Sequence, residues 1–74
     1  MPMNHLKVEK IQLNGKQHQI NAGIYLNELL NNLKIKIHKV AIEVNGVIIE
    51  KNKYPKFKLN ENDKVEIVHF IGGG

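Results

Sequence analysis

Three consecutive glycines, Gly72, Gly73 and Gly74, end this sequence and offer its most distinctive chemistry. Because glycine has no Cβ atom, three in a row make a thin, flexible segment that a narrow cleft of another protein can accept. The carboxylate of Gly74 becomes reactive only when a good leaving group, such as AMP from ATP, is attached to it. A sulfur nucleophile then gives a thiocarboxylate, whereas an amine gives an isopeptide conjugate. The alternative is an inert chain end, since termini are often frayed.

Side chains that could perform catalysis by themselves are scarce. The chain contains no Ser, Thr or Cys, which removes the common covalent nucleophiles and the thiolate metal ligands. The four histidines, at positions 5, 18, 38 and 69, do not stand at metal-ligand spacing, and no phosphate-binding loop is present. We therefore expect no metal site and no bound cofactor. The chain is predicted to be a carrier on which partner enzymes act, rather than an enzyme.

Size and charge limit the other possibilities. The chain has 74 residues, so we expect one domain over residues 1–71, followed by the flexible, reactive glycine tail 72–74. The net charge is +4, and every Lys or Arg position is a lysine. The absence of arginine argues against a nucleic-acid partner. No apolar run approaches the roughly 20 residues that span a membrane, and no signal peptide is recognisable. A cytoplasmic protein without a membrane partner is expected.

The first half of the sequence predicts a hairpin and a helix. Alternating apolar residues flank Asn14-Gly15, which favours strands over 7–13 and 16–20 with Ile11, Leu13 and Ile20 turned inward. A leucine stripe at helical spacing then predicts a helix of about three turns, with an apolar face made by Leu26, Leu29, Leu30 and Leu33. Asn21 or Ala22-Gly23 is expected to mark its start, although no Ser or Thr cap is present.

The second half predicts three further strands. Residues 40–44 and 47–49 flank a second Asn-Gly turn, residues 54–57 suggest an irregular crossing, and Leu59 is expected to enter the core. A turn over 60–63 leads into a last strand over 65–71. The order β-β-α-β-β-β predicts an α+β roll of the β-grasp type, in which one main helix packs on one face of a mixed sheet.

The last strand supplies the candidate docking surface. If Val65 and Ile67 face the core, then Glu66, Val68 and Phe70 face solvent. Exposed apolar residues on a small domain often mark a binding site, so we expect Val68, Phe70, Ile71 and Gly72 to meet a partner next to the tail. In the alternative arrangement the strand twists and Phe70 packs against the body.

In this order, these segments resemble the small sulfur carrier proteins of thiamine thiazole biosynthesis, a ubiquitin-like β-grasp family. The resemblance runs from about Lys10 to Gly74 and rests on the hairpin, the Leu26–Leu33 helix, the segments 40–46 and 63–68, and the final glycines. It implies that an adenylyltransferase of the ubiquitin-activating type uses ATP and magnesium to adenylate Gly74. Sulfur from a cysteine desulfurase then forms a thiocarboxylate, which thiazole synthase consumes. Gly73 and Gly74 match the essential pair of that family.

Three departures and several rival functions accompany this resemblance. Asn62 stands where a glycine is usual, Ile24 and Tyr25 stand at the helix start where Thr is common, and Lys39 and Lys51 stand where arginine is expected. One rival is the small subunit of molybdopterin synthase. The glycine tail of that subunit typically follows an apolar segment that contains proline, whereas residues 69–71 contain none. A ubiquitin-like protein modifier and an inert interaction domain are the others.

Overall fold

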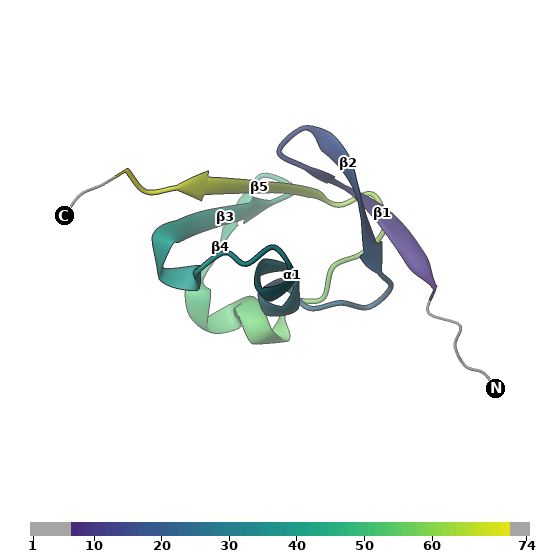
Figure 1. Cartoon of the computed structure of the whole chain (residues 1–74), viewed down its shortest axis with the longest axis horizontal. Helices are drawn as coiled ribbons and strands as arrows, with labels where there is room; N and C mark the ends of the chain where they lie inside the picture. The colour runs from purple at the N-terminus through teal and green to yellow at the C-terminus, as the bar shows by residue number, and fades with distance from the viewer. Residues whose placement is uncertain (1–6, 72–74) are drawn as a thin grey trace.

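The computed structural model describes residues 7–71, and within them five strands form a single sheet. The elements, with two short 3-10 helices named η1 and η2, are β1 (Val8–Leu13), β2 (Lys16–Asn21), α1 (Leu26–Asn32), η1 (Ile37–Lys39), β3 (Val40–Val44), β4 (Val47–Ile49), η2 (Lys51–Lys56) and β5 (Lys64–His69). The strand order is β2-β1-β5-β3-β4, in which only β1 and β5 run parallel. The predicted β-grasp arrangement with its mixed sheet is therefore confirmed (Figure 1).

Both Asn-Gly pairs form the predicted tight turns. Asn14 and Gly15 have φ angles of 50° and 81°, and Asn45 and Gly46 have φ angles of 54° and 84°. Asparagine and glycine tolerate this left-handed backbone better than other residues, and its twist suits a two-residue hairpin. The two turns fix the antiparallel registers of β1 with β2 and of β3 with β4. Asn62 also has a left-handed φ of 72°, as expected of a residue that replaces glycine.

The helix is shorter than predicted and starts later. It spans Leu26–Asn32, with Leu33 as the C-terminal cap and only half-buried. Tyr25 is the N-cap residue, and its backbone N–H donates to the Glu28 carboxylate at 2.9 Å. The Glu28 side chain thus satisfies the N–H of the N-cap residue, and the Glu28 N–H, which a Ser or Thr cap would bind, donates to the Tyr25 carbonyl oxygen at 2.9 Å. The expected start at Asn21 or Ala22-Gly23 is wrong, because these residues end β2 and form a turn.

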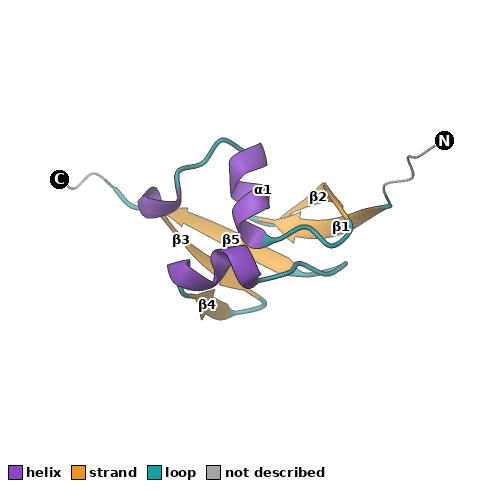
Figure 2. Ribbon diagram, turned by 90° about the horizontal axis from the view of Figure 1, so that it is seen from below, coloured by secondary structure: helices purple, strands orange, loops and turns teal. Residues whose placement is uncertain are grey.

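The core lies between the sheet and the helices, which all sit on one side of the sheet (Figure 2). Its members are Ile11, Ile20, Ile24, Leu26, Leu29, Leu30, Val40, Ile42, Val44, Tyr54, Leu59, Val65 and Ile67. The inward positions predicted for Ile11, Ile20 and Leu59 are confirmed. Leu13 is only half-buried and packs against the edge of the core.

Residues 51–56 differ from the predicted irregular crossing. They form the 3-10 helix η2, which contains Pro55 and buries Tyr54 completely. Proline is compatible with this short helix because its fixed φ suits a helical turn. The backbone of Lys53 donates to Glu50 at 2.9 Å, and that of Phe57 donates to Tyr54 at 3.3 Å. The segment between β4 and β5 is therefore anchored in the core.

Candidate functional site

The strand that precedes the glycines is β5, which lies between β1 and β3 in the sheet. Val65 and Ile67 point into the core and are 1% and 7% exposed, whereas Glu66 and Val68 face solvent. The predicted register is therefore confirmed. The strand ends at His69, two residues earlier than expected. Gly72, Gly73 and Gly74 lie outside the described residues, so the describable part of the predicted site is the surface formed by residues 68–71.

Val68, Phe70 and Ile71 all expose apolar surface at the end of β5. Their side chains are 58%, 57% and 96% exposed. The Phe70 backbone N–H donates to the carbonyl oxygen of Lys39 at 2.9 Å, and the Phe70 ring lies 5.1 Å from the Lys51 ammonium. Phe70 is thus held at the end of the sheet without entering the core. The arrangement in which Phe70 packs into the body does not occur.

The sheet face opposite the helices, here called the outer face, adds residues that sequence reasoning did not connect with the site. Across the pairing of β3 with β5, Ala41 lies opposite Val68 and Glu43 lies opposite Glu66. On β4, Ile48 lies opposite Glu43 and is 69% exposed. The outer face therefore combines exposed apolar side chains with two adjacent carboxylates. Strand alternation could have placed Glu43 and Ala41 on this face, but only the sheet order puts them beside β5.

The other edge of β5 is held by the turn of the first hairpin. The Asn14 backbone N–H donates to the carbonyl oxygen of Val65 at 2.9 Å. The Asn14 side-chain oxygen accepts from the backbone N–H of Ile67 at 2.7 Å, and its amide nitrogen donates to the Ile67 carbonyl oxygen at 3.3 Å. This pairing extends the parallel contact between β1 and β5 up to Ile67. The opposite edge of β5 pairs with β3 from Val65 to His69, so past Ile67 the described strand is paired on that edge alone.

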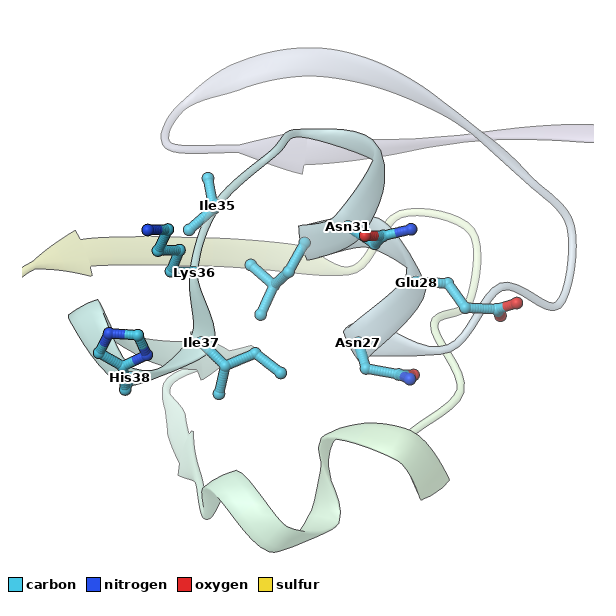
Figure 3. A pocket seen from close by; sticks show the side chains of 8 residues that line it. Asn27, Glu28, Asn31, Ile35, Lys36, Ile37 and His38 are labelled. Atoms are coloured by element: carbon cyan, nitrogen blue, oxygen red, sulfur yellow. The ribbon is translucent and has the colours of Figure 1, made fainter.

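A hollow of about 480 Å³ lies on the helix side of the sheet, between α1 and residues 35–38. Figure 3 shows Asn27 and Ile37 on opposite sides of it, with Lys36 and His38 at one end. Its lining includes the core residue Leu30, so it opens on the side of the sheet that Val68 does not face. The hollow is therefore separate from the candidate docking surface.

Titratable groups are dispersed over the described chain. Within residues 7–71, no three His, Asp or Glu side chains gather in a group that could hold a metal ion. His18 is on β2, His38 on η1 and His69 at the end of β5, whereas His5 lies outside the described residues. Burial raises the pKa of the Tyr54 phenol, which belongs to the core and not to the outer face. No helix in residues 7–71 is long and apolar enough to cross a membrane.

Comparison with known proteins gives consistent similarities. The model of the ThiS family matches residues 11–74. The chain is 38% identical over 66 residues to the sulfur carrier protein ThiS of Bacillus subtilis, covering 86% of this chain and 98% of that protein. The crystal structure of the thiamine biosynthesis protein ThiS from Geobacter metallireducens superposes with a TM-score of 0.77 at 29% identity, covering 88% of this chain and 99% of that one.

A second group of relatives is longer. The chain is 45% identical over 65 residues to a thiazole synthase of Magnetococcus marinus and 40% identical over 65 residues to one of Paramagnetospirillum magneticum. In both cases 88% of this chain is covered, and the chain spans 20% of the length of these relatives.

Proposed function

This chain belongs to the ThiS family, whose members include a sulfur carrier of thiamine biosynthesis, and we propose that it carries sulfur as a thiocarboxylate on Gly74. The observation that carries this proposal is that the family match extends through Gly73 and Gly74. The exposed residues at the end of β5 support it, because they lead directly to these glycines. The chain therefore acts as a carrier and co-substrate, and other proteins catalyse the reactions.

The proposed chemistry begins with activation of the carboxylate. An oxygen of the Gly74 carboxylate attacks the α-phosphorus of ATP, pyrophosphate leaves, and an acyl-adenylate forms. The terminal sulfur of a persulfide, derived from a cysteine desulfurase, then attacks the glycyl carbon and displaces AMP. A thiol cleaves the resulting acyl disulfide and releases the thiocarboxylate. Because glycine has no side chain, nothing shields the carbonyl carbon that the persulfide sulfur must approach.

An adenylyltransferase of the ubiquitin-activating type is the proposed partner for this step, and it supplies the site for ATP and magnesium. In this proposal the partner contacts Val68 on the outer face. Phe70, Ile71 and Gly72 contact the partner next to its own cleft, which accepts the glycine tail. Exposed apolar side chains beside the reacting terminus suit such an interface because their burial excludes water. Since the activation consumes ATP, we place the carrier in the cytoplasm.

Thiazole synthase is the proposed sulfur acceptor. Two proteins of that name contain a segment similar to this chain, which makes up about a fifth of their length. A carrier segment and its acceptor in a single chain would hold the sulfur donor at high effective concentration near the acceptor site. The separate carrier is expected to reach the same acceptor by docking.

The test is intact-protein mass spectrometry after incubation with the adenylyltransferase, ATP, magnesium and a sulfur donor. Replacing oxygen by sulfur adds nearly the same mass as one methionine oxidation, so a thiocarboxylate-selective probe must confirm the product. We expect probe labelling at Gly74 and none on a variant that lacks Gly74. Normal labelling of the shortened variant would overturn the proposal. Isopeptide adducts of higher mass would instead indicate a protein modifier.

The shortened variant also needs to be folded for this comparison. Among the described residues 7–71, the buried core residues lie between positions 11 and 67, so removal of Gly74 is expected to leave the unfolding midpoint unchanged. A folded variant without the product separates a defect of chemistry from a loss of structure. An unmodified carboxylate in the full chain, with the activating enzyme active on a known carrier, would favour an inert interaction domain.

A further inference from the structure

Lys51 makes two contacts where β5 ends, and the function proposed above does not account for them. Its ammonium donates a hydrogen bond of 2.7 Å to the carbonyl oxygen of Val40. The same ammonium lies 5.1 Å from the centroid of the Phe70 ring, within range of a cation–π contact. One charged group therefore touches both the start of β3 and the first residue after β5.

The end of β5 has few other supports. On its β1 side, the pairing ends at Val65 and the Asn14 side chain extends it to Ile67. On its β3 side, His69 pairs with Val40 and the Phe70 N–H donates to Lys39. Within the described chain, the segment after Ile67 is thus paired along one edge only. The direction in which the chain leaves the sheet depends on a small number of contacts around Phe70.

Lys51 reaches this place from an anchored position. It is the first residue of η2, and three residues later Tyr54 is completely buried in the core. Its hydrogen bond to Val40 is charge-assisted, and such bonds are stronger than neutral ones. The ammonium is therefore held over one side of the Phe70 ring, while 57% of Phe70 stays exposed to a partner.

We propose that Lys51 is a positioning residue that orients Phe70, the first residue after β5, for docking to the activating enzyme. This inference rests on the proposed function. A docking side chain that is already oriented loses less conformational freedom when it binds, so the effect is expected on association and not on the chemical step. Lys51 acts through Phe70 and has no contact with the reacting carboxylate in this proposal.

The test compares three variants in the adenylation assay. Lys51→Met keeps the aliphatic stem and removes both contacts, whereas Lys51→Arg keeps a cation in reach of Val40 and Phe70. Lys53→Met changes an exposed lysine on the same short helix and serves as the matched control. We expect Lys51→Met to raise KM for the carrier about fivefold with kcat unchanged. A change of this size corresponds to the free energy of one exposed cation–π contact together with one hydrogen bond.

Lys51→Arg and Lys53→Met are expected to stay close to the wild-type KM. An equal KM for Lys51→Met and Lys53→Met would overturn the proposal, as would a fall in kcat at unchanged KM. A double variant tests the route through Phe70. In a Phe70→Ala background, Lys51→Met should change KM by less than about twofold, because residues that act together are not additive. A full additional effect there would show that Lys51 does not act through Phe70.

A measurement on the free protein separates this inference from the proposed function. Hydrogen exchange of the Phe70 amide reports whether its bond to Lys39 stays closed, and it needs no partner. We expect faster exchange in Lys51→Met than in the wild type and in Lys53→Met, and restored protection in Lys51→Arg. Unchanged exchange would overturn the positioning role. A wild-type chain that is not adenylated would instead contradict the proposed function. The exchange measurement would still show whether Lys51 holds Phe70 in its bond to Lys39.

Discussion

The side-chain amide of Asn14 pairs with the backbone of Ile67 as a neighbouring strand would. Its oxygen accepts from the Ile67 N–H at 2.7 Å and its nitrogen donates to the Ile67 carbonyl oxygen at 3.3 Å. Because Asn14 also has a φ of 50°, one residue both turns the first hairpin and holds the strand that precedes the C-terminal glycines. The two residues are 53 positions apart in the sequence.

Replacement of Asn14 by glycine should show what this amide contributes. Glycine keeps the left-handed turn, so the variant loses mainly the two side-chain hydrogen bonds and leaves the Ile67 N–H without its partner. We expect the free energy of unfolding to fall by about 1–2 kcal/mol, measured by urea denaturation. Asn62→Gly, at another left-handed position with a φ of 72°, is the control and should change little. Equal losses in both variants would assign the effect to the backbone.

The adjacent carboxylates of Glu43 and Glu66 should oppose folding. They are directly opposite each other on the outer face, where like charges are destabilising. We expect Glu66→Lys to raise the free energy of unfolding by about 0.5 kcal/mol, with a smaller gain at high salt. The turn variant Glu61→Lys controls for the change in net charge. A gain of the same size in Glu61→Lys would show that the pair itself is not responsible.

Within the described chain the buried Tyr54 hydroxyl group lies near the Ile42 backbone but makes no hydrogen bond of good geometry, so its removal should not destabilise the protein. We expect Tyr54→Phe to match or slightly exceed the wild-type free energy of unfolding at neutral pH, because the variant no longer buries an unpaired polar group. Urea denaturation measures this difference. A loss of more than about 1 kcal/mol would mean that the hydroxyl group has a partner after all.

The same variant predicts a difference at alkaline pH. Burial raises the pKa of Tyr54, so the folded protein keeps the phenol proton at a pH where the unfolded chain releases it. Wild-type stability relative to Tyr54→Phe should therefore be constant below about pH 10 and fall as the pH rises above it. Denaturation curves of the two proteins across this range test the sign. Parallel pH profiles would contradict it.

Phe70→Ala should weaken activation of the carrier without harming its fold. The ring is 57% exposed, so its truncation removes surface that a partner can bury and little of the core. We expect KM for adenylation to rise about tenfold, which corresponds to roughly 1.4 kcal/mol, with an unchanged melting temperature. Val8→Ala is the matched control, because Val8 is 53% exposed and lies at the far end of the sheet. Equal kinetics of both variants would remove Phe70 from the interface.

Local patterns in the sequence were sufficient to predict the strands, the main helix and their inward faces, but not the 3-10 helix η2 or the exact ends of α1 and β5. Two Asn-Gly turns, a leucine stripe and the alternation around Glu66 predicted the strand and helix order and the register of β5. Each of these signals acts between residues close in sequence, where backbone sterics and hydrophobic periodicity decide the outcome. The role of Gly73 and Gly74 also comes from sequence, through the family resemblance, and stays a prediction.

Other features depended on segments that only the fold brings together. The strand order places β5 between β1 and β3, which puts Glu43 beside Glu66 and lets Asn14 reach Ile67. Sequence reasoning also missed the burial of Tyr54, because the pattern around Pro55 carries no periodic signal. The sequence by itself determined the order of the strands and the main helix and which face of each is apolar. Tertiary structure decided which of them became neighbours, because contacts between distant segments follow from packing the whole core and not from local preference.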